Sequence, residues 1–106
     1  MPQYLYRIQP VRLAMLTDGP TEREAQVVRE HFEYLEGLVA SGTVIMAGRT
    51  TDADERAFGI VVFLADSQVH AREIVQGDPA VNHGVMRAEL FPYRIALWSP
   101  KGPGGA

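Results

Sequence analysis

The stretch FGIVVFLADS, residues 58–67, carries the pattern on which the fold prediction rests. Its first part, up to Ala65, is apolar and rich in β-branched and aromatic residues, which favour β-strands. An apolar run this short, closed by polar residues, is typical of a buried strand. Asp66 or Ser67 then offers a side chain that caps a helix, and we expect that helix to continue to about Gln76. The stretch therefore predicts a strand that leads directly into a helix.

A longer helix lies upstream of this stretch. Thr21, with Glu24 three residues later, forms a capping box at its start, and Ser41-Gly42 ends it. Between these signals, apolar residues recur at spacings of three and four, which is one face of an amphipathic helix. The residues of this face are Ala25, Val28, Phe32, Leu35 and Val39.

Three further strands complete the pattern. TVIMAG, residues 43–48, is interpreted as a buried strand, and the polar residues 49–57 as the loop that follows it. QYLYRIQ, residues 3–9, alternates apolar and polar residues, as strands do. We expect the last strand over residues 85–98. It should lie at an edge or be bulged, because Pro92 has no N–H to donate to a neighbouring strand.

The predicted order is strand, helix, strand, strand, helix, strand. Right-handed connections fold this βαββαβ order into a four-stranded antiparallel sheet with both helices on one face, the ferredoxin-like arrangement of the α+β class. Both middle strands are interpreted as apolar on both sides: Phe58, Ile60, Val62 and Leu64 point one way, and Val61 and Phe63 the other. Because a monomer would leave one apolar face in water, we expect a homodimer joined through its sheets.

Length and composition limit the kinds of protein this can be. The 106 residues suffice for one domain, which we place at residues 1–99, with residues 100–106 as a flexible tail rich in Gly and Pro. A net charge of −3 argues against a nucleic-acid partner, and no apolar run reaches the roughly 18–20 residues of a membrane span. The absence of cysteine excludes disulfides and thiolate chemistry, so a cytoplasmic location is the default expectation.

Three stretches together resemble the YCII-related (YciI-like) family, which belongs to the dimeric α/β-barrel group of ferredoxin-like proteins. They are REHFEYLEGLVASGTVIMAGRT, FGIVVFLADS and GDPAVNHGVMRAELFPYRIAL. The resemblance covers residues 3–98. It implies a small cytoplasmic dimer with an active site built on a histidine–aspartate pair, which falls on His31 and Asp78. A few members of the family are small-molecule enzymes of aromatic degradation, including a dehydrochlorinase-type member.

The residues themselves support this pair. At about 100° per residue, His31 lies on the same side of its helix as Val28, Leu35 and Leu38. An imidazole directed toward the sheet needs a hydrogen-bond partner. Asp78 follows the second helix, which lies beside the first on the same sheet face. Its carboxylate could accept the proton of one ring nitrogen and fix the tautomer. A satisfied core histidine and an ordinary Asp-Pro turn remain the alternatives.

Cationic residues could bind an anionic substrate. Arg49, at the exit of the strand 43–48, is the first candidate, because a guanidinium can receive a carboxylate or a phenolate. Arg7 and Arg12 are weaker candidates, with surface ion pairs as their alternative. The apolar segment 11–17 is expected to form the wall or the lid of a pocket, since loops that stay on the surface are normally polar.

The remaining polar groups are interpreted as solvated. Asp52, Asp54 and Glu55 are too few for a metal site built on oxygen ligands, so no metal is expected. His83 is assigned to a surface turn and His70 to an exposed helix face. No cofactor is expected, because the chain has neither a glycine loop that cradles phosphate nor another motif of this kind.

Two functions from different classes fit these residues. The first is a cofactor-independent enzyme of the lyase or isomerase type, in which His31 acts as general acid or base and Asp78 orients it. Its ligand would be a small anionic or aromatic molecule. The second is a non-catalytic dimeric module that binds a small ligand. A histidine that faces an open cavity favours the enzyme, and a sealed pair without a cavity favours the module.

Overall fold

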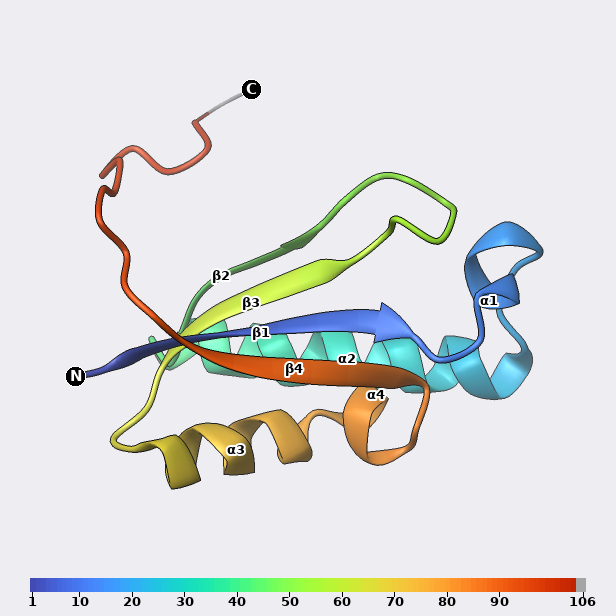
Figure 1. Cartoon of the computed structure of the whole chain (residues 1–106), viewed down its shortest axis with the longest axis horizontal. Coiled ribbons are helices and arrows are strands. Elements are labelled where there is room, and N and C mark those ends of the chain that lie inside the picture. The colour runs from blue at the N-terminus through green and yellow to red at the C-terminus, as the bar shows by residue number, and fades with distance from the viewer. Residues whose placement is uncertain (105–106) are drawn as a thin grey trace.

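A four-stranded antiparallel sheet in the order β2-β3-β1-β4 forms the centre of the computed structural model, which describes residues 1–104 (Figure 1). The elements in chain order are β1 Gln3–Pro10, α1 Ala14–Thr17, α2 Glu22–Ala40, β2 Val44–Arg49, β3 Gly59–Leu64, α3 Gln68–Gly77, α4 Pro79–Asn82 and β4 Met86–Tyr93. This is the predicted ferredoxin-like βαββαβ fold, with two additional short helices. Residues 105 and 106 of the predicted tail lie outside the described residues.

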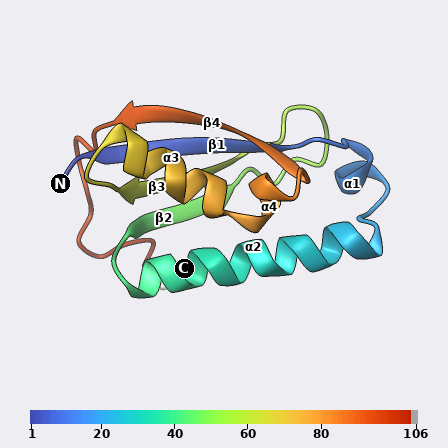
Figure 2. The ribbon, with the colours of Figure 1, turned by 90° about the horizontal axis from the view of Figure 1, so that it is seen from below.

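The two long helices pack on the same face of the sheet. Figure 2 shows α2 running beside β2, while α3 and α4 lie across the other strands. The strand register places Tyr6 of β1 opposite both Val61 of β3 and Leu90 of β4, so these side chains share the helix-covered face. The side chains that alternate with them lie on the other face, which we call the open face.

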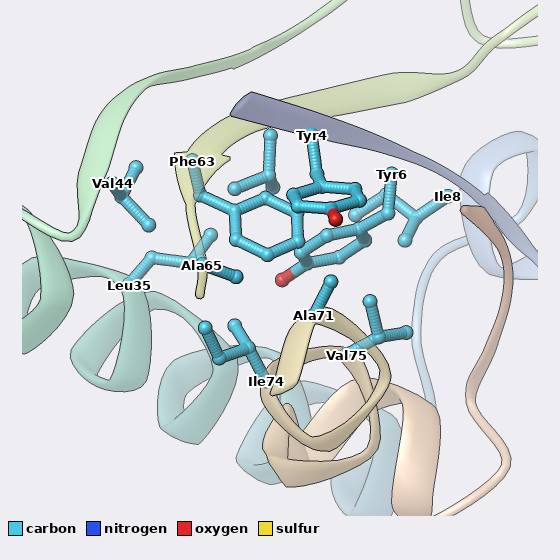
Figure 3. Close-up of a cluster of buried hydrophobic side chains, with 11 residues drawn as sticks. Tyr4, Tyr6, Ile8, Leu35, Val44, Phe63, Ala65, Ala71, Ile74 and Val75 are labelled. Carbon is cyan, nitrogen blue, oxygen red and sulfur yellow. The ribbon is translucent and has the colours of Figure 1, made fainter. Parts of the chain in front are cut away.

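The core fills the space between the helix-covered face and α3. Tyr6 and Phe63 are fully buried there, with their rings edge to face and their centroids 5.6 Å apart. Figure 3 shows Tyr4, Tyr6 and Phe63 directed from the sheet toward Ala71 and Val75 of α3. The aromatic side chains of β1 and β3 thus hold α3 against the middle of the sheet.

The signals that the sequence offers for the helix ends are confirmed. The Thr21 hydroxyl accepts from the Glu24 N–H, and the Glu24 carboxylate accepts from the Thr21 N–H. Helix α3 begins after Ser67, whose side chain accepts from the N–H of His70. Gly42, just past the end of α2, has a φ of 82°, which glycine adopts without strain.

The predicted core face of α2 is only partly buried. Leu35 is buried, but Phe32 is 63% exposed and Val39 is 50% exposed. Both residues follow the helical period correctly. Both side chains line a cavity beside the sheet, and the part of each that faces it is not covered.

Two strand predictions are wrong in part. The segment 43–48 was expected to be buried, but β2 is an edge strand in which only Val44 is buried. The last strand ends at Tyr93, short of the predicted 98, because Tyr93 pairs with Gln3 and β1 begins there. No strand residue remains to pair with the chain beyond Tyr93. The expectation for Pro92 is confirmed, since β4 is the other edge strand.

The open face is less apolar than the sequence suggested. The central strands are β3 and β1, and β1 contributes Gln3, Arg7 and Gln9 to this face alongside Leu5. Apolar surface gathers at the far end of β4, where Phe91 is 43% exposed and Tyr93 is 46% exposed. The open face therefore combines an apolar end with a polar end.

Candidate active site

A histidine–aspartate pair links α2 to the junction of α3 and α4. The Nδ1 atom of His31 lies 2.8 Å from each carboxylate oxygen of Asp78, although the two residues are 47 positions apart. His31 is at the middle of α2, on the side facing the other helices. Pro79 cannot continue α3, so the chain turns at Asp78, whose backbone is extended with φ −69° and ψ 120°. The structure thus brings the two predicted residues together.

Asp78 is fully buried and accepts hydrogen bonds from three sides. Besides His31, the hydroxyl of Tyr6 donates to Oδ2 at 2.7 Å, and the N–H of Ala80 donates to Oδ1 at 2.9 Å. The Ala80 contact makes Asp78 the cap of α4, with Pro79 in the first helical position, where its missing N–H costs nothing. Each carboxylate oxygen therefore has a fixed donor of its own.

These donors determine where the proton of the pair lies. The oxygens of a carboxylate are acceptors only, so the hydrogen of the contact between Asp78 and His31 belongs to His31. Nδ1 therefore carries a proton, and in the neutral imidazole Nε2 is left with a lone pair. The His31 side chain is 12% exposed.

Two tyrosine hydroxyls close to Asp78 remain protonated. Burial, followed by the charge of Asp78 and the hydrogen bond to it, raises the pKa of Tyr6 far above its usual range. Burial and the charge of Asp78 also raise the pKa of Tyr34. The Tyr34 hydroxyl donates to the backbone oxygen of Ile74 at 2.6 Å, so it joins α2 to α3 without contacting the carboxylate.

A cavity of about 610 Å³ lies between α2 and the β2–β3 side of the sheet. His31 is part of its wall, whereas Asp78 lies behind the histidine, outside the lining. Most of the wall is apolar, including Ile8, Val28, Phe32, Leu35, Val39 and Phe58. Leu16 of α1 also lines the cavity, so the apolar segment 11–17 contributes to the wall, as expected. A cavity of this volume is in the range that binds small molecules.

Few polar side chains reach this cavity. Arg49 lies on the helix-covered side of β2, because it pairs with Gly59, which in turn faces Ile8 of β1. Its Nε donates to the backbone oxygen of Thr50 at 3.0 Å, and no carboxylate of residues 1–104 lies within 4.0 Å of it. Glu36 lines the cavity from α2.

The other two arginine candidates lie elsewhere. Arg12 forms a two-pronged ion pair with Glu24, at 2.6 and 2.9 Å, outside the cavity lining. The Arg12 guanidinium and the Thr21 N–H lower the pKa of Glu24 to about 2. Arg7 lies on the open face, where its Nε is 3.4 Å from Glu89 and its guanidinium is 5.5 Å from the centre of the Phe58 ring.

The acidic loop before β3 is organised by its own arginine. Arg56 lies 2.9 Å from Asp54 and 4.0 Å from Asp52. Within residues 1–104, no three His, Cys, Asp or Glu side chains gather in a way that would hold a metal ion. In the same range, no helix has the length and apolar character to cross a membrane.

Tyr6 is a residue of the site that sequence reasoning missed. The alternation of β1 places it on the helix-covered side. A buried phenol needs a hydrogen-bond partner, so its hydroxyl was a signal that some acceptor lies beneath the sheet. The identity of that acceptor depends on how α3 packs, which the strand pattern does not contain.

Fold and site together define a class of protein. It is a ferredoxin-like domain in which a buried carboxylate holds a histidine at the wall of an apolar cavity. Within this class, the chain belongs to the YCII-related domain family, whose model matches residues 6–94. The chain is also similar in structure to 5-chloro-2-hydroxyhydroquinone dehydrochlorinase from Burkholderia phenoliruptrix AC1100, solved in complex with 2,5-dihydroxybenzoquinone. The TM-score is 0.64 at 20% identity, over 87% of this chain and 93% of that chain. Among curated proteins, none matches this sequence.

Proposed function

We propose that the protein is a cofactor-independent small-molecule enzyme of the lyase or isomerase type. His31 acts as its general acid or base, and Asp78 orients His31. The observation that carries the proposal is the position of the imidazole: Nδ1 is held 2.8 Å from both oxygens of a buried carboxylate, while the ring lines a 610 Å³ cavity. An imidazole that faces an open cavity, rather than being sealed behind it, favours the enzyme over the binding module.

The reaction begins when Nε2 of His31 takes a proton from a carbon or hydroxyl of the substrate. The electron pair left behind moves into an adjacent carbonyl or carbon–carbon bond. In an elimination, it expels a halide or hydroxide ion from the neighbouring carbon. The imidazolium, stabilised by the charge of Asp78, then gives its proton to the product, the leaving group or water. One positioned base suffices for these steps.

The cavity favours a flat apolar substrate with one acidic oxygen. Its walls are aliphatic and aromatic, which suits a ring. Arg49, with no carboxylate of residues 1–104 within 4.0 Å, offers its guanidinium to a phenolate or carboxylate at the cavity edge. The similar dehydrochlorinase was solved with a dihydroxybenzoquinone, a molecule of this kind. Arg7 and Arg12 are assigned to their ion pairs rather than to the substrate.

Turnover of a small substrate panel tests the proposal. The panel contains 5-chloro-2-hydroxyhydroquinone, followed by chloride release, and aromatic hydroxy acids, followed by deuterium uptake from D2O. General acid–base groups typically contribute about 10²–10⁴-fold to the rate, so His31→Gln should lower kcat by a factor in that range. His70→Gln is the matched control, since His70 also has an aspartate neighbour, Asp66 at 3.7 Å, but is 42% exposed and lies outside the cavity lining.

Three outcomes separate the alternatives. Loss of turnover in His31→Gln but not in His70→Gln supports the enzyme. Wild-type turnover in His31→Gln excludes His31 as the acid or base. Thermal stabilisation by ligands without turnover of any compound would favour the non-catalytic binding module instead. Arg49→Gln should weaken the binding of anionic ligands more than that of neutral ones.

A homodimer joined through the open faces is part of the same proposal. Phe91 and Tyr93 expose apolar surface at one end of that face, and a second copy would cover it. Sedimentation at micromolar concentration should give twice the chain mass of 11.7 kDa, and Phe91→Glu should shift the protein toward the monomer. A wild-type protein that sediments as a monomer would contradict this part.

A further inference from the structure

The buried hydroxyl of Tyr6 connects the sheet to the histidine–aspartate pair. Tyr6 is fully buried on β1, and its hydroxyl donates to Oδ2 of Asp78 at 2.7 Å across 72 positions of sequence. The ring alone would fill the core as phenylalanine does, packed against Phe63. The hydroxyl therefore adds a contact to the pair that the packing of the core does not require.

The three donors together fix the plane of the carboxylate. The Ala80 N–H holds Oδ1 and the Tyr6 hydroxyl holds Oδ2, so the group cannot rotate about its Cβ–Cγ bond without breaking one of these bonds. In this orientation, His31 Nδ1 is equally distant, 2.8 Å, from both oxygens. Without the Tyr6 hydroxyl, the Ala80 N–H would still hold Oδ1, and His31 would be the one remaining donor at Oδ2 among the hydrogen bonds described.

The hydroxyl also competes with His31 for the negative charge of the carboxylate. Each donor draws electron density from the acceptor it shares with the others, and in a buried site with little water this competition is strong. We propose that Tyr6 is a positioning residue of the pair: it fixes the orientation of the Asp78 carboxylate and sets the strength of the hydrogen bond that Asp78 accepts from His31. The consequence for catalysis rests on the function proposed above.

Tyr34 provides a matched control for Tyr6. It is a second phenol close to Asp78, and it also joins two elements of the core. Its hydroxyl, however, donates to the backbone oxygen of Ile74 and not to the carboxylate. Removal of either hydroxyl costs one hydrogen bond, fully buried for Tyr6 and partly buried for Tyr34, and some stability. Only the removal of the Tyr6 hydroxyl should change the hydrogen bond of His31.

The test is the Nδ1 proton resonance of His31 in ¹⁵N-labelled protein without ligand. In Tyr6→Phe the carboxylate loses a competing donor, so the His31 bond strengthens and the Nδ1 proton moves downfield. In Tyr34→Phe the resonance stays at its wild-type position. If the Nδ1 resonance is the same in Tyr6→Phe and in the wild type, or moves equally in both variants, the positioning role is overturned and Tyr6 serves stability alone.

A second measurement covers the case in which Tyr6→Phe does not fold. Incorporation of 3-fluorotyrosine into the Tyr34→Phe protein makes the Tyr6 phenol more acidic and therefore a stronger donor. The fluorinated Tyr6 phenol should draw more electron density from the Asp78 carboxylate, which weakens the hydrogen bond from His31. The Nδ1 proton should then move upfield, opposite to the effect of Tyr6→Phe. An unchanged or downfield resonance would contradict the proposal. The protein keeps all its ring packing in this experiment, apart from one fluorine on each tyrosine.

The inference and the proposed function can fail separately. The resonance shifts are measured without substrate, so they stand or fall whether or not His31→Gln loses turnover. Where turnover is found, Tyr6→Phe should lower kcat and leave KM near its wild-type value, because Tyr6 does not line the cavity. A change confined to KM would show that Tyr6 acts on binding rather than on the pair.

Discussion

Replacement of Asp78 by alanine should destabilise the protein severely. The substitution leaves two fully buried donors, the Tyr6 hydroxyl and the Ala80 N–H, without an acceptor, and it releases His31. A hydrogen bond to a charged group contributes about 1.5–3 kcal/mol, so the two buried donors account for a loss of about 3–6 kcal/mol. This is a large part of the roughly 5–15 kcal/mol by which domains are stable.

Urea unfolding, monitored by circular dichroism, measures the loss in the free energy of unfolding, and thermal unfolding gives the melting temperature. At about 4 °C or more per kcal/mol for a domain of this size, we expect the melting temperature to fall by at least about 12 °C. Asp66→Ala is the control, because the side chain of Asp66 is 72% exposed, and its removal should change stability by less than about 0.5 kcal/mol. If Asp78→Ala lowered the free energy of unfolding by less than about 1 kcal/mol, the hydrogen bonds from Tyr6 and Ala80 to Asp78 would be refuted.

Three further predictions concern other parts of the chain. The pKa of Glu24 is lowered to about 2 from an ordinary value of 4.5. The charge of Glu24 therefore contributes fully to the free energy of unfolding above pH 4.5, and this contribution is lost as the pH falls through 2. The difference in unfolding free energy between wild type and Glu24→Gln should shrink over that interval, and a difference that grew would contradict the ion pair. Gly77→Ala should destabilise the protein, because a Cβ there would lie 2.8 Å from the Tyr34 hydroxyl. Gly37→Ala, where a Cβ would meet nothing within 4 Å, should stabilise it by about 0.5–1 kcal/mol. Equal effects of the two variants on the free energy of unfolding would count against the packing of Gly77 on Tyr34. Deletion of residues 101–106 should move the melting temperature by less than roughly 4 °C, and a larger fall would mean that the tail docks on the domain.

Much of the fold could be predicted from the sequence because the helix ends depend on contacts between residues close in the chain. The hydroxyl of Thr21 and the carboxylate of Glu24 satisfy N–H groups within one helical turn, and Ser67 does the same for α3. Such contacts need no information from distant parts of the chain. The pairing of His31 with Asp78 was predicted from the family resemblance and from the side of the helix on which His31 lies.

Features that depend on the distance between elements were not readable. The helical period places Phe32 on the same side as Leu35, but it does not say how far α2 stands from β2, and that distance leaves Phe32 exposed at the cavity. The contact of Tyr6 with the carboxylate depends on how closely α3 approaches β1. The end of β4 is set by the start of its partner strand rather than by its own residues.

The tautomer of His31 is the most direct test of the claim that Asp78 holds Nδ1–H and leaves the Nε2 lone pair for the cavity. In Asp78→Asn, the amide oxygen can still accept from the Ala80 N–H, while the new NH2 group donates to Nδ1 of His31 and faces the Tyr6 hydroxyl, which loses its acceptor. The variant should be less stable than the wild type but folded, with the histidine forced into the other tautomer. Two-bond ¹H–¹⁵N spectra of the neutral imidazole should therefore show Nδ1–H in the wild type and Nε2–H in Asp78→Asn, accompanied by loss of turnover. A wild-type histidine protonated at Nε2, or the same tautomer in both proteins, would contradict the claim.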